Sequence, residues 1–463
     1  MKMLKILFGL LAIGLWQGGM CAVHAEDAAY VVLGEGRTAE ARLITQAPRC
    51  PDIVINGRKR QMQARALPAT EPQRPTQSRP EFSKPSVFDV RVCEAPLPAE
   101  TRSALIEGHR LPVRKSRLDR LVVIGDTGCR LKAADNAWQA CNDPAAFPFA
   151  RIARQVAAWH PDAVIHVGDY EYRENPCPDD QAGCAGSPWG YGWDAWKADF
   201  FTPGAPILRS APLILARGNH ESCSRAGQGW WRFLDPRPLE LHRDCNDPAF
   251  DVTGDYSAPY AVDFGGGAQI AVMDLSHAGG AAIPQDDPRF AAFTDTYDRL
   301  AAMTKKARFT FAVDHYPFLA VSADEKTHAL FAGNKALAST FGTRNPYLMP
   351  EGVDVLLAGH VHLWEQVSYR DHFPSQFVAG FSGTQEDIVP LPVQVPAGIG
   401  PVPGAVIDQF SSWIDGFGFM TLERTSENRW RVEVHDGEGR VVNRCRIIGR
   451  ASVCDQAAVA AIR

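Results

Sequence analysis

The sequence predicts an α/β protein, with helices outside a largely parallel core of one or two sheets and a small β-rich region before it. From Leu121 on, β-branched apolar runs recur along the chain, in the order LVVIGD, AVIHVGD, LILARGN, QIAVMD, FTFAVDH and VDVLLAGH. Such strands are buried on both faces, as in parallel sheets. The segments between these runs are long enough to hold helices, which is typical of alternating α/β folds.

The chain of 463 residues is long enough for more than one domain. We expect a signal peptide at residues 1–25, a small β-rich domain at 26–117 and the α/β domain at 118–463. Two lysines precede an apolar run at 6–16, and small residues end at Ala25, the expected cleavage site. This pattern predicts an exported protein, periplasmic or secreted. A lipid anchor at Cys21 and an uncleaved anchor are the alternatives, although the apolar run is shorter than the ~20 residues of a membrane helix.

Cysteine usage agrees with export. Of the 11 cysteines, ten remain when Cys21 is removed with the signal peptide, and an even number is expected of a disulfide-bonded exported protein. No Cys-x-x-Cys occurs, which disfavours a thiolate zinc site. As a hypothesis, near neighbours pair and the two that are left pair with each other: Cys129–Cys141, Cys177–Cys184, Cys223–Cys245, Cys445–Cys454 and Cys50–Cys93.

The region before residue 118 reads as short alternating strands, interrupted by a long proline-rich polar loop at 67–85. With Cys50 and Cys93 on distant strands, this pattern favours a small sandwich of immunoglobulin or fibronectin type, in which a disulfide joins the two sheets. The basic run at 58–60 is read as a solvated face. The formal net charge is only −5, so no nucleic-acid-binding surface is evident.

The α/β region has helical spacing at 147–159, 290–303 and 325–341. No segment of the mature chain is apolar for long enough to cross a membrane. The chain is expected to close with strands at 418–424 and 429–435 and a loop from Cys445 to Cys454. A further segment at 388–406, rich in proline and glycine, is expected to be a loop.

Polar side chains follow the apolar runs at the point where each run ends. Ligands sit at the carboxyl ends of strands in such folds, so these side chains are expected to face one point. Carboxylates, a phenol and imidazoles suit transition metals better than calcium or magnesium alone. They are too many for one ion, whereas two ions that share a carboxylate would use them all. They are Asp126, Asp169, Tyr172, Asn219, His220, His315, His360 and His362.

In order, GDTG, GDYEY, GNHE, a strand-end histidine and GHVH resemble the five-block pattern of the calcineurin-like metallophosphoesterases, and in detail the purple acid phosphatases. Asp126-Thr127-Gly128 replaces the usual Asp-x-His, and Tyr172 stands three residues after Asp169, as in the purple acid phosphatases. The resemblance covers about 121–423 and implies a β-sandwich core flanked by helices. The fourth block departs from the subfamily pattern, with Ala312 three residues before His315.

The resemblance implies two metal ions that share Asp169. It places Asp126, Tyr172 and His362 with Asp169 around the first, ferric ion, coloured by the phenolate. It places Asn219, His315 and His360 with Asp169 around the second, which is iron, zinc or manganese. Hydroxide activated by the metals attacks phosphorus, and His220 donates a proton to the leaving oxygen or stabilises it. Glu221 is expected to orient its neighbours.

Several residues have a structural alternative to a functional role. Asp274 is read as a turn former or cap. Arg217 and Arg225 are either contacts for a substrate phosphate or salt-bridge partners. Tyr170 competes with Tyr172 for the buried position. The tryptophans beside the blocks, at 189, 193, 196, 230 and 231, are read as packing residues.

The sequence therefore predicts an exported dinuclear-metal phosphoesterase that hydrolyses a phosphorylated small molecule, in the first place a phosphomonoesterase of acid phosphatase type. A phosphodiesterase or nucleotide hydrolase on the same fold is the alternative enzyme, because the metal blocks do not set what lies beyond the phosphate. A binding protein with an inert metal site is the alternative from another class. The complete set of candidate ligands argues against inertness.

Overall fold

The computed structural model describes residues 28–76, 78–324, 326–370 and 372–459. The predicted signal peptide, with Cys21, lies outside these residues. Within them, no helix combines the length and the apolar composition that a bilayer span requires.

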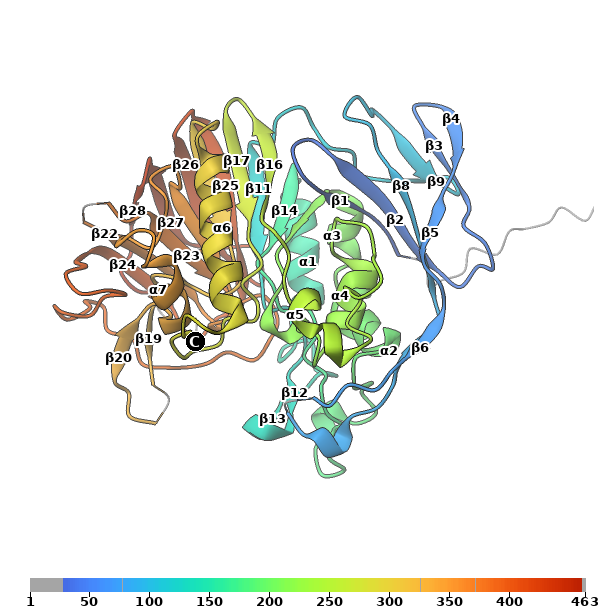
Figure 1. Ribbon diagram of the computed structural model, residues 1–463, viewed down its shortest axis with the longest axis horizontal. Coiled ribbons are helices and arrows are strands. Elements are labelled where there is room, and N and C mark those ends of the chain that lie inside the picture. Colours follow the sequence, from blue (N-terminus) through green and yellow to red (C-terminus); the bar gives the residue numbers. More distant parts are fainter. Residues whose placement is uncertain (1–27, 77, 325, 371, 460–463) are drawn as a thin grey trace, which may run out of the picture.

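The first of two large sheets is built around three parallel strands, β11 (Arg120–Ile124), β14 (Ala163–His166) and β15 (Leu213–Leu215). Four antiparallel strands from the end of the chain complete one side of it: β25 (Gly418–Ser426), β26 (Arg429–Asp436), β27 (Val441–Ile448) and β28 (Ala451–Cys454). β25 pairs directly with β11. The last strands of the chain therefore lie beside the first strand of the α/β region (Figure 1).

The second sheet is parallel at its centre and antiparallel at both ends. The parallel strands are β17 (Ala268–Val272), β18 (Phe309–Val313), β21 (Val355–Ala358) and β23 (Ser375–Ala379). The antiparallel strands are β16 (Tyr260–Gly265), β22 (Trp364–Tyr369) and β24 (Ile407–Trp413).

The two sheets pack face to face through alternating side chains. On β11, Leu121 and Val123 join the core between the sheets, together with residues such as Phe311 of β18. Val122 and Ile124 point the other way, against the helices. This alternation follows from the two-residue period of a strand, and full burial of each side chain stabilises the fold by about 1.5–3 kcal/mol. The predicted α/β class with a two-sheet core is confirmed.

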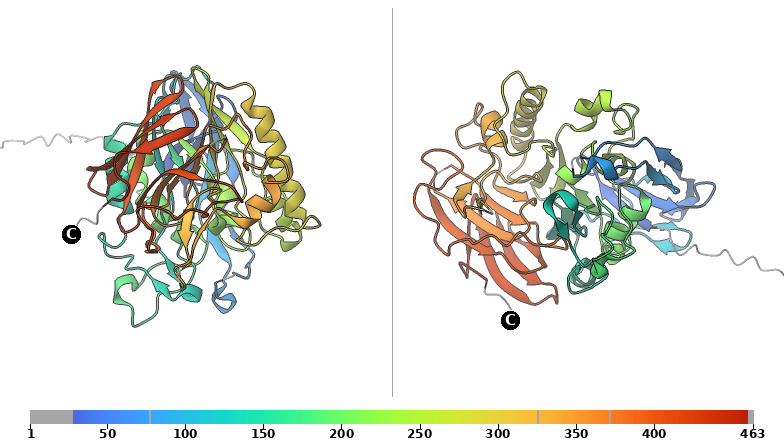
Figure 2. Two further views of the ribbon diagram at one scale, coloured as in Figure 1. Left: turned by 90° about the vertical axis from the view of Figure 1, so that its left-hand side faces the viewer. Right: turned by 90° about the horizontal axis from the view of Figure 1, so that it is seen from below.

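Helices cover both outer faces of the sandwich (Figures 1 and 2). The first sheet is covered by α1 (Phe149–Ala158), α2 (Trp193–Trp196), α3 (Ala205–Ser210) and α4 (Gly227–Phe233), with the short α5 (Asp251–Gly254) nearby. The second is covered by α6 (Pro288–Thr304) and α7 (Lys335–Phe341). Trp193, Trp196, Trp230 and Trp231 are buried in the first of these layers, so the packing interpretation holds for them. Trp189 is half-buried, with the Lys84 ammonium 4.0 Å from its ring centroid.

Two sequence predictions in this region are wrong. The helix predicted at 325–341 is confined to α7, and a hairpin of β19 (Val321–Ala323) and β20 (Leu330–Ala332) precedes it. Gly333 has φ +71°, and the Asn334 side chain caps α7 by accepting from the backbone N–H groups of Ala336 and Leu337, so the helix begins only there. The expected loop from Cys445 to Cys454 is the β27–β28 hairpin.

The N-terminal region is rich in strands, as predicted. β1 (Ala28–Leu33), β2 (Ala39–Thr45), β8 (Arg91–Pro96) and β5 (Gln63–Ala66) extend the first sheet, because β1 pairs in parallel with β15. A separate sheet of β10 (His109–Arg110), β9 (Ala104–Ile106), β3 (Asp52–Ile55) and β4 (Arg58–Gln61) packs on them. The first sheet thus contains strands from both sides of the domain boundary predicted at residue 117. That boundary stays a prediction. The basic run at 58–60 forms β4 and is exposed.

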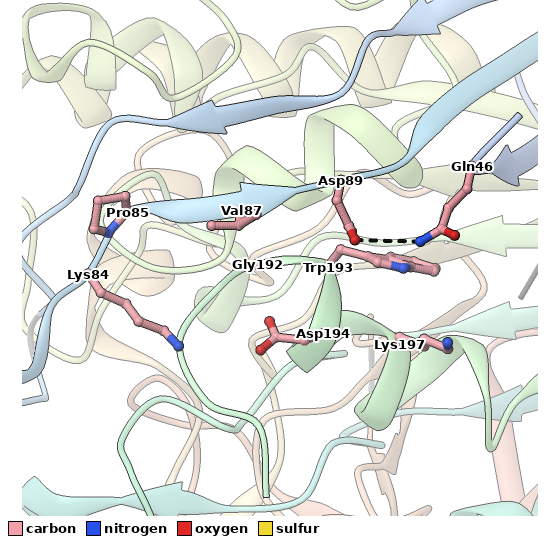
Figure 3. Close-up of a pocket in the computed structure, with 9 residues that line it drawn as sticks. All are labelled: Gln46, Lys84, Pro85, Val87, Asp89, Gly192, Trp193, Asp194 and Lys197. Atoms are coloured by element: carbon pink, nitrogen blue, oxygen red, sulfur yellow. Dashed lines mark hydrogen bonds between the residues drawn. The ribbon is translucent and has the colours of Figure 1, made fainter. Parts of the chain in front are cut away.

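Smaller elements complete this side of the molecule. β6 (Ala69–Glu71) pairs with β7 (Ser86–Phe88) across the long loop that the sequence predicts, which also holds the short helix η1 (Pro80–Phe82). Where this segment meets α2, residues including Lys84, Val87 and Trp193 line a cavity of about 430 Å³ (Figure 3).

All five predicted disulfides are present: Cys50–Cys93, Cys129–Cys141, Cys177–Cys184, Cys223–Cys245 and Cys445–Cys454. Cys93 lies on β8, and Cys50 precedes β3 in the neighbouring sheet. Their bond therefore joins the two sheets of the N-terminal region, as the sequence predicts.

Candidate active site

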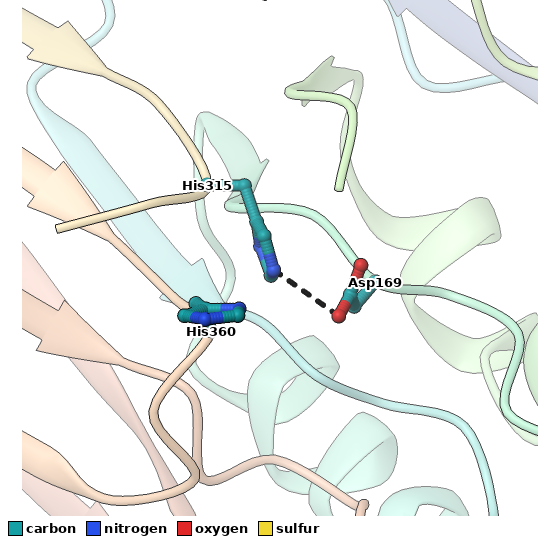
Figure 4. Close-up of side chains that lie close together, drawn as sticks. All are labelled: Asp169, His315 and His360. Atoms are coloured by element: carbon teal, nitrogen blue, oxygen red, sulfur yellow. Dashed lines mark ion pairs between the residues drawn. The ribbon is translucent and has the colours of Figure 1, made fainter. Parts of the chain in front are cut away.

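The predicted site residues meet at one edge of the sandwich. Asp126 and Asp169 follow β11 and β14, and Asn219 and His220 lie in the short helix η5 (Asn219–Glu221) after β15. His315 follows β18 in the second sheet, while His360 and His362 follow β21. Figure 4 shows Asp169, His315 and His360 turned toward one another. The structure brings together all eight candidates, because the parallel strands of both sheets end at the same edge.

The turns that present these side chains have unusual backbone conformations. Asp126, Asp169 and His360 have φ values of +52°, +59° and +72°. Residues other than glycine are uncommon in this left-handed region, and they concentrate at functional sites. The close approach also requires glycine at 218, because a Cβ there would lie 2.0 Å from Asp169 Oδ1. Strained backbone conformations thus orient three of the candidate side chains toward the site.

The first donor cluster, which consists of Asp126, Asp169, Tyr172 and His362, converges on the Tyr172 hydroxyl. Tyr172 Oη lies 2.9 Å from Asp126 Oδ1, 2.8 Å from Asp169 Oδ2 and 2.9 Å from His362 Nε2. The hydroxyl has a single proton for these three neighbours. On the far side of its ring, His362 Nδ1 lies 2.8 Å from the Gln385 carbonyl oxygen, so a neutral His362 carries its proton there and directs a lone pair inward. The cluster therefore has more lone pairs than protons, and a bound cation would satisfy the lone pairs that remain.

The second donor cluster consists of Asp169, Asn219, His315 and His360. Asn219 Oδ1 lies 3.0 Å from both His315 Nε2 and His360 Nδ1. His315 Nε2 also lies 3.1 Å from Asp169 Oδ2. The other nitrogen, His315 Nδ1, faces the Val167 carbonyl oxygen at 3.0 Å, so a neutral His315 directs its lone pair at these two acceptors. Ligand atoms of Asp169, His315 and His360 lie within 4.8 Å of one another, as a single ion requires.

Asp169 is common to both clusters, and its charge controls protonation there. Burial lowers the pKa of His315, but the Asp169 carboxylate outweighs this effect and raises that pKa to about 10. Burial and the neighbouring His315 lower the pKa of His360 to about 3. Without a metal, a proton therefore occupies the space between His315 and Asp169. Since ligand imidazoles must be unprotonated, a metal ion competes with this proton.

His220 lies beside these clusters and belongs to neither. Its ring contacts that of Tyr172 in a tilted arrangement, with 3.7 Å between centroids and 35° between the planes, and its Nε2 lies 3.9 Å from Asp169 Oδ2. Its Nδ1 lies 3.1 Å from the Glu171 carbonyl oxygen and 3.3 Å from Glu174 Oε1. Burial lowers the pKa of His220 well below its usual value, and the Arg225 guanidinium, 2.7 Å from Nε2, adds to this effect.

Glu221 organises the turns around the clusters, as the sequence predicts. Its carboxylate accepts from the backbone N–H groups of Gly218 at 3.0 Å, Asp169 at 3.1 Å and Tyr170 at 2.8 Å. These bonds tie the turn after β14 to the turn after β15. Glu221 therefore fixes the position of Asp169 without contacting the donor atoms.

Two further positioning residues were not predicted. The fully buried Asp199 accepts from the backbone N–H groups of Tyr172 at 2.8 Å and Cys129 at 3.1 Å, and so holds the first cluster. Asp387 Oδ2 lies 3.3 Å from His362 Nδ1. Asp199 lies in a helical turn and Asp387 in a loop, and neither follows an apolar run, so no sequence signal marks them.

The structural alternatives are also resolved. Tyr170 donates to the Ala216 carbonyl oxygen at 2.9 Å and packs in the core, so it is the structural tyrosine. Arg217 pairs with Asp255 at 3.0 Å and lies 3.6 Å from Asp274, so these three residues form a buried ion-pair group. Arg225 pairs with Glu174.

The chemistry of both donor clusters fits cations, and the fold holds them at the edge where such folds bind ligands. Together these features define a candidate metal centre at the ligand-binding edge of an α/β fold. The chain belongs to the calcineurin-like phosphoesterase family, whose model matches residues 119–363, more than half of the sequence. Members of this family use a dinuclear metal centre.

Comparison with solved structures shows the same fold at low sequence identity. A purple acid phosphatase isolated from yellow lupin (Lupinus luteus) seeds aligns with a TM-score of 0.54 and 14% identity, over 92% of this chain and 73% of that one. The structure of PhoD aligns with a TM-score of 0.54 and 11% identity, over 95% and 92%. No curated protein matches the sequence significantly.

Proposed function

We propose that this protein is an exported phosphomonoesterase of acid phosphatase type that works with two metal ions. The observation that supports it best is the position of Asp169, whose carboxylate is shared by two converging donor clusters. A shared carboxylate is the arrangement that holds two ions close enough to act on one phosphate. The family membership gives the reaction class, and the donor clusters supply the ligands.

The proposed ligands of the first ion are the first donor cluster, Asp126, Asp169, Tyr172 and His362. Those of the second are Asp169, Asn219, His315 and His360. The first set offers two carboxylates and a phenol, which suit a hard trivalent ion such as Fe(III). The second adds only neutral nitrogen and amide ligands to Asp169, which suits a divalent ion, namely iron, zinc or manganese.

Such a pair of ions, when bound, polarises phosphate oxygens and lowers the pKa of water. The chain supplies the proton for the leaving group. His220 Nδ1 faces the Glu171 carbonyl and the Glu174 carboxylate, and Nε2 lies between Arg225 Nη2, at 2.7 Å, and Asp169 Oδ2, at 3.9 Å. We assign to it the donation of this proton or the stabilisation of the leaving oxygen. Because its pKa is lowered by burial and by Arg225, the protonated form is present only at acidic pH.

The test is hydrolysis of p-nitrophenyl phosphate and bis-p-nitrophenyl phosphate by metal-loaded protein. The proposal expects faster turnover of the monoester. Faster turnover of the diester would favour a phosphodiesterase, and turnover of neither would favour a binding protein with an inert site. Elemental analysis with a visible spectrum tests the metals independently, because a ferric ion bound to the Tyr172 phenolate is expected to be coloured.

Export is a second part of the proposal, supported by the five disulfides. N-terminal sequencing of protein recovered from the periplasm or the medium is expected to start near Glu26. Recovery of full-length chain only from the cytoplasm, with reduced cysteines, would contradict it.

A further inference from the structure

A polar pocket lies directly beside the first donor cluster. Its volume is about 700 Å³, and it is formed by three segments that are distant in sequence. They are the hairpin of β12 (Leu131–Lys132) and β13 (Ala137–Trp138), the tip of the β19–β20 hairpin, and the loop at 385–390. In Figure 1 both hairpins project from the same lower side of the molecule.

The pocket is connected to the candidate centre through His362. Gln385 and Asp387 line the pocket, and both contact His362 Nδ1, through the Gln385 carbonyl oxygen at 2.8 Å and Asp387 Oδ2 at 3.3 Å. Arg130 Nη1 donates to Asp387 Oδ1 at 2.9 Å. Arg130 is thus connected to the candidate centre through Asp387 rather than by a direct contact. The connection is indirect, because no residue of the two donor clusters lines the polar pocket itself, and none lines the cavity of Figure 3.

The side chains that line the polar pocket favour some classes of substrate over others. Its cations, Arg130 and Lys326, are offset by Asp135 and Asp387, and Arg130 pairs with both aspartates. The pocket therefore has no surplus positive charge for a second phosphate. Among the described residues that line it, none is Phe, Tyr or Trp and only His328 offers an aromatic ring, so a nucleobase or nitrophenyl ring finds little aromatic surface on which to stack.

One lining group is left without a partner. Glu386 Oε1 is buried and makes no hydrogen bond to any described residue. A buried acceptor without a partner is costly, and a ligand hydroxyl would satisfy it. Asn136 and Gln385 add amide groups to the lining.

From these observations we infer that the polar pocket binds the alcohol part of the substrate, and that this part is a hydroxyl-bearing aliphatic group, as in a sugar or polyol phosphate. Glu386 is then a specificity-determining residue that accepts a hydrogen bond from a substrate hydroxyl. The inference rests on the proposed monoesterase function and names its substrate class.

The test compares kcat/KM for glucose 6-phosphate, ethyl phosphate and AMP. Ethyl phosphate shares the alkoxide leaving group but lacks further hydroxyls, so the wild type is expected to prefer glucose 6-phosphate by at least about tenfold, the effect of one good hydrogen bond. AMP is expected to be no better than glucose 6-phosphate. Preference for AMP, or equal rates for the first two esters, would overturn the inference.

Glu386→Ala is expected to lower the ratio of glucose 6-phosphate to ethyl phosphate about tenfold, chiefly through KM, and Glu386→Gln to lower it less because an amide oxygen still accepts. Glu240→Gln, at a side chain that is 58% exposed, is the control and should leave the ratio unchanged. An unchanged ratio in Glu386→Ala with wild-type metal content would refute the assignment. If the wild type hydrolyses none of these esters and no p-nitrophenyl phosphate, the proposed function itself fails, and the inference with it.

Discussion

The two donor clusters share Asp169 but differ in burial and charge. In the first, Asp126, Tyr172 and His362 are all buried. In the second, His315 is buried, whereas Asn219 and His360 are partly exposed. The first cluster therefore combines anionic oxygens with exclusion of water, and the second combines neutral ligands with access to solvent. From this difference we expect the proposed first ion to be held tightly and the proposed second ion to exchange with solvent.

The clusters also differ in how they are supported. The first depends on groups outside the turns that follow the strands, namely Asp199 behind Tyr172 and the Gln385 carbonyl behind His362. The second depends on the turns that follow the strands themselves, through the Val167 carbonyl oxygen behind His315. Support of ligands from behind fixes their orientation and is important for metal affinity.

The largest effect is expected from Asp169→Asn, which removes the charge that both clusters share. Both ions should be lost, and kcat should fall by about 10³-fold or more, in the range of a removed metal or oxyanion contact. Elemental analysis measures the loss. Asp295→Asn, on the exposed face of α6, is the matched control. Wild-type metal content in Asp169→Asn would show that the two clusters do not share the Asp169 carboxylate as a ligand.

His220→Ala is expected to keep both ions and lower kcat by about 10²–10⁴-fold, the usual contribution of a positioned acid. The sign of the pH effect is fixed by the lowered pKa of His220: its acid form disappears as the pH rises through that value. The wild-type rate should therefore fall as the pH rises through the acidic range, and the variant should lack this limb. A variant with wild-type kinetics and pH profile would remove His220 from the reaction.

Asn219→Ala removes a proposed ligand of the second ion only, so it should weaken that ion alone, by at least about 10- to 100-fold in affinity, because loss of a ligand costs no less than loss of a supporting contact. Because Asn219 and His360 are partly exposed, brief treatment with a chelator is expected to reproduce this state in the wild type. One equivalent of divalent metal should leave while the visible absorption remains. Simultaneous loss of both ions would show that the clusters do not differ in accessibility.

The smallest effect on activity is expected from Tyr172→Phe, which leaves three ligands for the first ion. The visible band should disappear, with a modest fall in rate of about tenfold. Tyr170→Phe is the matched control: it breaks the bond to the Ala216 carbonyl, costs about 1 kcal/mol of stability and should leave the spectrum unchanged. A spectrum that persists in Tyr172→Phe would refute the phenolate ligand.

The convergence of the candidate residues could be predicted because most of them stand just after a buried strand. Asp126, Asp169 and Asn219 stand directly after apolar runs, and parallel strands bring such positions together whatever the loops do. Asp199 and Asp387 act on the same residues but lie in segments without a periodic pattern, so their role depends on tertiary packing that the sequence does not display.

The fold, like the candidate site, is predicted in part: local patterns are predicted, but contacts between distant segments are not. Apolar periodicity predicts the central strands of both sheets, but it cannot tell which strands become neighbours. It does not reveal that β1 joins β15, nor that β25 is inserted beside β11. At 325–341 the helical period misleads, because Gly333 and Asn334 start the helix late and release the preceding residues to form a hairpin.

The position of β25 has a consequence for biogenesis. Its strand, at residues 418–426, supplies the neighbour of β11, and β11 in turn leads to Asp126. Until the final part of the chain has been synthesised, the strand that presents this aspartate lacks one of its two partners. Pairing between segments so distant in sequence is slow, since a long loop must close first. We therefore expect the site to assemble only after synthesis of the chain is complete, and a chain that stops short of residue 418 to lack activity.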